Sequence, residues 1–159
     1  MNEIRNIMAA VDFSDISKHL VRYAVQLARK LEAAAHVVNV INQRDVEALR
    51  RVTEATSAFS FADHLETVRD DRMNGLTTLL ADLDIPPDHI GRHVRTGVPY
   101  EALSNAIQEL DIDLLIMGTR GRGQFTGMLF GSTAARMLSK CPVPLMTLRN
   151  AVARRVERG

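Results

Sequence analysis

Residues 113–133 read DLLIMGTRGRGQFTGMLFGST, and this stretch decides the fold. It begins with a short apolar run, Asp113 to Met117, which has the length and composition of a strand buried on both faces. Five of the nine glycines of the chain follow between Gly118 and Gly131. Ser132 and Thr133 then have the small polar side chains that are typical of a helix start. A strand, a glycine-rich loop and a helix in this order predict an α/β protein with a ligand at the loop.

The same alternation of strands and helices extends over the rest of the chain. Short apolar or β-branched runs predict strands at Ile4–Val11, His36–Ile41, Ile90–Arg95, Asp113–Met117 and Val143–Leu148. Apolar residues at helical spacing predict helices at Leu20–Leu31, Ala62–Leu83, Ala102–Leu110 and Thr133–Lys140. Ser14 or Asp15 is the expected N-cap of the first helix. The polar segment from Asn42 to about Ser60 has some helical character but no firm boundaries.

Alternating strands and helices predict right-handed crossovers and a five-stranded parallel sheet with helices on both faces. The expected strand order is 3-2-1-4-5, in which the chain winds outward from the first strand and then returns past it. The switch point then lies between the carboxyl ends of the first and fourth strands. Asp12 to Ser14 and the loop from Gly118 would line the crevice there. We expect one domain over residues 1–149 and a polar tail over residues 150–159.

Composition excludes several classes of partner. The chain has 159 residues, of which 46% are hydrophobic, and its formal net charge is +1. Such a balance gives no long-range attraction to nucleic acid or to anionic lipid. No run of about eighteen apolar residues predicts a membrane span, and the N-terminus lacks the pattern of an export signal. The single cysteine, Cys141, is expected to be a small buried hydrophobe in a reducing compartment. These observations predict a cytoplasmic protein.

The glycine-rich loop has the properties of an anion site. Glycine allows a loop to wrap an anion with its backbone N–H groups, because it adopts positive φ angles and has no Cβ. The helix that begins at Gly131-Ser132 adds further N–H groups and the positive end of its dipole, which favours phosphate. Arg120 and Arg122 could add positive charge. The alternative is a flexible surface loop. The loop lacks both the P-loop sequence and the dinucleotide fingerprint.

The glycine spacing resembles that of a known family. Gly118, two residues, Gly121, nine residues and then Gly131-Ser132 is similar to the motif that marks the ATP-binding branch of the universal stress protein family. The resemblance covers nearly the whole chain, and it includes the segments Val11–Ser14, Gly97–Pro99, Asp113–Gly118 and Cys141–Val143 together with Val40. It implies a Rossmann-like fold of the adenine nucleotide alpha hydrolase-like type.

The resemblance also implies where an adenine nucleotide would lie. In such proteins the residues that match Ala10 and Asp12 lie beside the adenosine, and the residue that matches Val40 packs on the adenine. Met117 and Gly118 would lie under the nucleoside. The residues implied to approach the ribose and the phosphates are Arg120, Gly121, Gly131, Ser132 and Thr133. A divalent cation, Mg²⁺ or Mn²⁺, would accompany ATP through its phosphates.

Each of these residues also has a purely structural interpretation. Asp12 could cap the first helix, and Ser132 could be a plain N-cap of the last one. Val40 and Met117 would be core residues in any protein of this fold. Arg120 could be a solvated surface charge.

The sequence favours a nucleotide-responsive binding module over a metabolic enzyme. The five histidines have no metal-binding spacing and are expected on the surface or on helix faces, and no catalytic site is predicted. The resemblance implies a regulatory or stress-resistance role. Slow ATP hydrolysis or phosphotransfer at the same site is the alternative, because a bound metal and a phosphate clamp lower the barrier by electrostatics. AMP or a cyclic nucleotide is another possible ligand.

Two further expectations concern assembly and movement. The apolar segment Val143–Leu148 is expected at the sheet edge, where proline is tolerated and where pairing with another chain is favoured. The resemblance implies a homodimer through this strand, while the sequence alone also permits a capped monomer. Because residues 43–60 leave the second strand near the predicted crevice, we expect them to act as a lid that orders on ATP.

Overall fold

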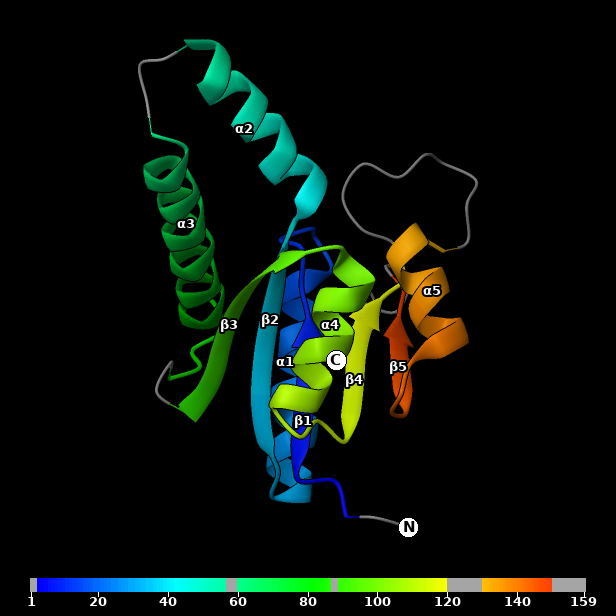
Figure 1. Ribbon diagram of the computed structural model, residues 1–159. Helices are drawn as coiled ribbons and strands as arrows, with labels where there is room; N and C mark the ends of the chain where they lie inside the picture. Colours follow the sequence, from blue (N-terminus) through cyan, green and yellow to red (C-terminus); the bar gives the residue numbers. More distant parts are fainter. Residues whose placement is uncertain (1–2, 57–59, 87–88, 120–129, 150–159) are drawn as a thin grey trace.

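The computed structural model describes residues 3–56, 60–86, 89–119 and 130–149, which form five strands and five helices (Figure 1). The strands are β1 (Asn6–Ala10), β2 (Ala34–Asn42), β3 (Ile90–Gly97), β4 (Leu114–Gly118) and β5 (Leu145–Leu148). The helices are α1 (Ser17–Leu31), α2 (Gln43–Thr56), α3 (Phe61–Ala81), α4 (Pro99–Glu109) and α5 (Ser132–Lys140). None of the helices in these four ranges is both long and apolar enough to cross a membrane.

The five strands form one parallel sheet in the order β3-β2-β1-β4-β5, which confirms the predicted order. β1 is the middle strand, and Ile7 in it pairs with Ala35 of β2 on one side and with Leu114 of β4 on the other. The connection after β1 leads toward β2, and the connection after β4 leads toward β5. The carboxyl ends of β1 and β4 are therefore the switch point, where diverging loops leave room for a ligand.

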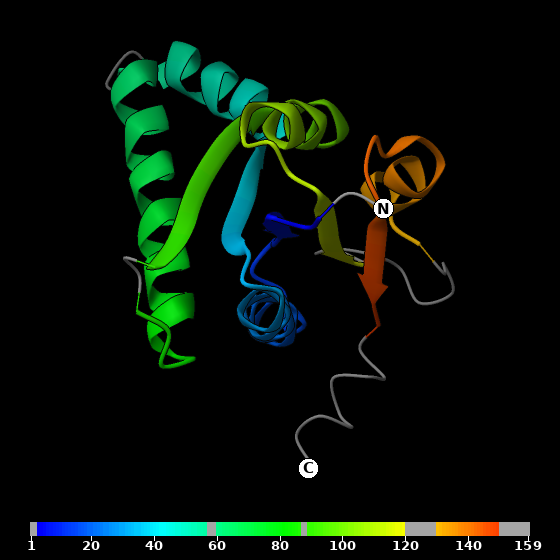
Figure 2. The same ribbon diagram turned by 90° about the horizontal axis from the view of Figure 1, so that it is seen from below.

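Helices cover both faces of the sheet, as predicted: α1 and α3 lie on one face and α4 and α5 on the other (Figure 2). Successive side chains of a strand point to opposite faces. Ile7 accordingly belongs to the buried cluster that contains Leu20 of α1 and Leu80 of α3. The next residue, Met8, belongs to the cluster on the other face, together with Leu103 of α4. These two layers of core hold the sheet rigidly below the switch point.

The segment between β2 and β3 contains two helices, where the sequence predicts one helix and an undefined polar stretch. α2 occupies most of that stretch and extends beyond the carboxyl end of β2 (Figure 1). Thr53 is its one fully buried residue, and its large apolar residues are few, namely Val46, Leu49 and Val52, so the sequence shows helical character without firm ends. α3 begins one residue before the predicted Ala62, because the Ser60 hydroxyl accepts a hydrogen bond from the Asp63 N–H at 3.4 Å.

Several boundaries differ by a few residues from the prediction. β3 continues to Gly97, whose φ of 149° is rarely adopted by residues with a side chain. α4 then starts at Pro99, a position where the missing N–H of proline has no helical partner to lose. β5 starts at Leu145 and not at Val143, because Pro144 has no N–H for the ladder, although its carbonyl accepts from the Leu115 N–H at 3.0 Å. β5 is an edge strand, as predicted.

Two histidines contradict the expectation that all five lie on the surface or on helix faces. His36 of β2 and His93 of β3 are half-buried strand residues, with His36 Nδ1 3.1 Å from His93 Nε2. Gly91 leaves space for them, because a Cβ there would collide with both rings. Burial lowers the pKa of His36. Burial also lowers the pKa of His93, helped by the charges of His36 and Arg95.

The histidine pair is expected to make stability depend on pH. Because both pKa values are lower in the folded state than the ordinary value of 6.5, the folded protein binds these protons more weakly than the unfolded chain does. The neutral histidines are therefore the form that the folded state favours. Their contribution to the free energy of unfolding is complete above pH 6.5 and is lost as the pH falls and the rings are protonated. Urea unfolding at pH 7 and pH 5 should show a smaller free energy of unfolding at the lower pH.

The matched variant is the double substitution His36→Gln and His93→Gln, which removes both titrating rings and keeps Arg95 and Glu109. Arg95 is the charged group of β3 that acts on His93, and its Nη2 lies 2.9 Å from Oε2 of Glu109 in α4. The variant should lose less stability than the parent between pH 7 and pH 5. Equal losses in the two proteins would show that the pair does not control this dependence.

Candidate functional site

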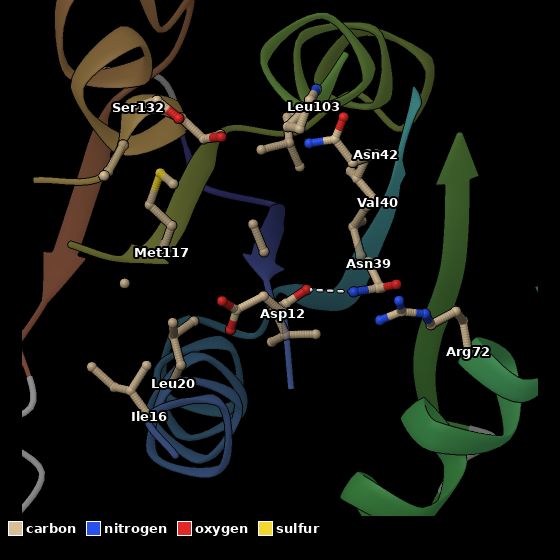
Figure 3. Close-up of a pocket in the computed structure, with 18 of the residues that line it drawn as sticks. Asp12, Ile16, Leu20, Asn39, Val40, Asn42, Arg72, Leu103, Met117 and Ser132 are labelled. Atoms are coloured by element: carbon tan, nitrogen blue, oxygen red, sulfur yellow. Dashed lines mark hydrogen bonds between the residues drawn. The ribbon is translucent and has the colours of Figure 1, made fainter. Parts of the chain in front are cut away.

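A pocket of about 420 Å³ lies at the predicted switch point, over the carboxyl ends of β1, β2 and β4 (Figure 3). Its volume is within the range of small-molecule sites, which is about 300–1,000 Å³. Eight of the ten predicted site residues line it: Ala10, Asp12, Val40, Met117, Gly118, Gly131, Ser132 and Thr133. The other two, Arg120 and Gly121, lie outside the described residues. Four separate segments of the chain thus contribute to the wall of one pocket.

The turn after β1 is built around Asp12. Its Oδ1 accepts hydrogen bonds from the Ser14 N–H at 3.1 Å, from the Ser14 hydroxyl at 2.6 Å and from the Ser17 hydroxyl at 3.4 Å. Phe13, between them, has a φ of 60°. The predicted N-cap at Ser14 or Asp15 is wrong, because Ile16 is the N-cap and makes no side-chain capping bond. Asp12 closes the turn earlier in the chain, which holds its carboxylate at the pocket wall.

The first turn of α5 opens into the pocket. Gly131 is the N-cap, in an extended conformation with φ −72° and ψ 162°, so the interpretation of Ser132 as a plain N-cap is wrong. Glycine has no side chain with which to cap the helix. The Gly131 N–H donates to the Thr119 carbonyl at 2.9 Å, which fixes the helix start beside the end of β4. The first N–H groups of an α-helix have no partners within the helix, and together with the helix dipole they favour an anion.

The middle of the pocket has apolar walls. Met117 and Leu103, on the α4 side of the sheet, are 6% and 3% exposed, and Val40 is half-buried beside them. Ile16 and Leu20 contribute from the α1 side (Figure 3). Val40 and Met117 thus belong to the core, as their structural interpretation predicts, and also line the cavity. Apolar walls of this kind suit a flat ring system between polar ends.

Sequence reasoning missed a group of polar residues at the other end of the pocket, namely Asn39, Asn42, Asp45 and Arg72. Asn39 is 1% exposed, and its Nδ2 donates to the Val11 carbonyl at 2.8 Å. A buried amide within the apolar run His36–Ile41 is a signal that could have been noticed. Arg72 gives no such signal, because a charged residue on a long amphipathic helix is usually solvated.

Within the four described ranges, no three or more His, Cys, Asp or Glu side chains are grouped in a way that could hold a metal ion. The oxygen donors among the described pocket residues include the carboxylates of Asp12 and Asp45, the hydroxyls of Ser132 and Thr133 and the amide oxygens of Asn39 and Asn42. Oxygen donors are the ligands that Mg²⁺ prefers. The free cysteine, Cys141, is half-buried, and burial raises the pKa of its thiol, which disfavours the reactive thiolate.

The sequence model of the universal stress protein family matches residues 3–149 of the chain. The chain belongs to this family. A relative, universal stress protein G of Salmonella typhimurium, is 27% identical over 135 residues, which cover 85% of this chain and 90% of that protein. A universal stress protein E homolog of Haemophilus influenzae is 26% identical over 91% of this chain, which spans only 48% of that relative's length.

The fold of the family is also found among solved structures. One universal stress protein, solved in complex with cAMP, superposes with a TM-score of 0.62 at 17% sequence identity. The match covers 93% of this chain and 98% of that one. At this identity the likeness establishes the shared fold. The α/β fold of this chain is therefore shared with that solved member of the family.

Proposed function

We propose that this universal stress protein binds ATP in the pocket at the switch point. The observation that carries the proposal is the position of α5, whose N-terminus at the N-cap Gly131 opens into one end of a cavity with apolar walls. Phosphates would bind at this end, because backbone N–H groups and the helix dipole both favour negative charge there. The family's structure with bound cAMP supports an adenine nucleotide as the ligand. Titration of the protein with Mg-ATP tests the proposal directly.

The predicted residues have distinct roles in this proposal. Ala10 and Asp12 would lie beside the adenosine, Val40 would pack on the adenine, and Met117 and Gly118 would lie under the nucleoside. The residues proposed to approach ribose and phosphates are Arg120, Gly121, Gly131, Ser132 and Thr133. Mg²⁺ or Mn²⁺ would be held mainly by the phosphate oxygens, and the pocket's carboxylates and hydroxyls would complete its oxygen shell.

We further propose that the protein is a cytoplasmic regulatory module that forms a homodimer. The dimer would signal whether nucleotide is bound. β5 supports this, because it is an edge strand with half-buried side chains and one free side for pairing within the described sheet. The alternative use of the same site, slow ATP hydrolysis or phosphotransfer, predicts turnover that is lost together with ATP binding. AMP and cAMP are the competing ligands to include in the titration.

ATP is expected to slow hydrogen exchange in α2. The helix is already formed over Gln43–Thr56, which differs from the predicted ordering of this segment, and Thr53 is its one buried residue. Asp45 in its first turn lines the pocket, next to Asn42 at the end of β2. A ligand that contacts this end should therefore suppress the local opening of α2. Exchange measured with and without saturating ATP checks this, and unchanged exchange across residues 43–56 would disprove the lid.

A further inference from the structure

The pocket end formed by Asn39 and Arg72 has hydrogen-bonding groups that phosphate binding at α5 does not use. Ser132 lies at one end of the cavity and Arg72 at the other, because α5 flanks β4 and β5 while α3 flanks β3 (Figures 1 and 3). Arg72 belongs to α3, in the segment between β2 and β3, and is far in sequence from the glycine-rich motif. This end lies beside Val40, where the proposed function puts the base.

Asn39 has an acceptor that lacks a donor. Its Nδ2 must be the atom that faces the Val11 carbonyl, because only the amide nitrogen can donate to a carbonyl oxygen. The orientation of the carboxamide is thereby fixed, and Oδ1 points the other way. This oxygen is buried and has no hydrogen-bond partner among the described residues. Buried polar atoms are nearly always paired, so an orphan beside a cavity indicates a missing donor.

Arg72 is placed to supply that donor. Its guanidinium carbon lies 5.8 Å from the centroid of the Phe13 ring, and its side chain points toward Asn39 (Figure 3). Phe13 is held close to α3 by Gly75, since a Cβ at Gly75 would lie 3.0 Å from Phe13 Cε1. The ring is thus a platform that supports Arg72 through a cation–π contact. A guanidinium has five N–H donors, so it can serve two acceptors at once.

We propose that Arg72 reads the base of the bound nucleotide: one N–H donates to Asn39 Oδ1, and another donates to a ring-nitrogen acceptor on the edge of a purine. Asn39 is the positioning residue, and Arg72 is the residue that contacts the ligand. This inference rests on the proposed function, because it assigns a base contact at the same pocket. The chemistry it selects is an aromatic ring with an acceptor at its edge, which both adenine and guanine offer.

The test pairs a protein variant with a change in the ligand. Affinities of the full chain are measured by calorimetry for Mg-ATP and for ATP analogues in which ring nitrogen N1, N3 or N7 is replaced by carbon. Arg72→Gln removes the guanidinium. Arg69→Gln is the matched control, because Arg69 is an exposed residue one turn earlier on the same helix that donates to the Thr96 hydroxyl at 3.4 Å and does not line the pocket. Asn39→Leu removes the orphan acceptor and keeps the volume of the side chain.

We expect Arg72→Gln to weaken ATP binding about tenfold or more, and Arg69→Gln to leave it unchanged. One deaza analogue should bind the parent protein more weakly than ATP does, and this difference should disappear in Arg72→Gln and in Asn39→Leu. If the parent binds ATP but Arg72→Gln matches Arg69→Gln, or if the analogue difference persists without Arg72, the inference is wrong and the proposed function stands. A difference that persists in Asn39→Leu alone refutes the role of Asn39. A parent protein that binds no ATP overturns both.

Discussion

Replacing Gly131 by valine together with Ser132 by alanine is expected to weaken ATP binding by at least about 100-fold. Gly131 is buried on the pocket wall, so a branched side chain there must occupy space next to the phosphate end or displace its neighbours. Ser132→Ala also removes the hydroxyl of a residue that lines the pocket at the start of α5. Each hydrogen bond to a charged group is worth about 1.5–3 kcal/mol, so the loss of even two gives this effect.

The backbone makes this substitution informative. Gly131 has φ −72° and ψ 162°, a conformation that valine adopts without strain, so the change tests the space for a ligand and not the turn itself. Ser139→Ala, on the exposed last turn of α5, is the matched control and should bind ATP like the parent. Calorimetry and thermal unfolding of the three proteins separate lost binding from lost folding. Normal ATP affinity in the double variant would show that the start of α5 does not contribute to ATP binding.

Ile7→Ala should produce the largest loss of stability, about 2–5 kcal/mol in the free energy of unfolding. Ile7 is 0% exposed in the middle strand of the sheet, between Ala35 and Leu114. It belongs to the core cluster that joins α1 and α3 to the sheet. The truncation both loses buried apolar area and leaves a cavity that the rigid sheet cannot close.

Val52→Ala is the matched truncation on a poorly packed element. Val52 is 60% exposed on α2, so its loss should change the free energy of unfolding by less than about 0.5 kcal/mol. Chemical denaturation monitored by circular dichroism measures both variants. Similar effects of the two substitutions would contradict the contrast between a central core and a loosely attached α2.

The strand order could be predicted because each strand has a simple pattern. β1 and β4 are continuous apolar runs that are buried on both faces, and the helices between the strands impose parallel pairing. The bounds of α2 could not be predicted, because Val46, Leu49 and Val52 are its only large apolar residues, which gives the segment helical character but no firm ends. The helix packs against α3 and β2, the elements that follow and precede it in the chain.

The candidate site residues could be predicted only where a short sequence pattern indicates a ligand. Glycine spacing and a Gly-Ser helix start lead from sequence to Gly131 and Ser132, and an aspartate after a strand leads to Asp12. Arg72 reaches the pocket because α3 follows α2 and packs beside β2 and β3, which no local pattern reveals. The pairing of His36 with His93 likewise depends on the strand register, in which Val38 is opposite His93.

The central claim is that the pocket at the switch point binds ATP with its phosphates at the start of α5. The most direct measurement is a calorimetric titration of the purified chain with Mg-ATP, followed by competition with AMP and cAMP. The account predicts saturable micromolar binding at one site per chain, with ATP favoured over both competitors because its longer phosphate chain meets α5. The absence of any binding heat at millimolar ATP would contradict it, and the pocket would then serve another ligand or none.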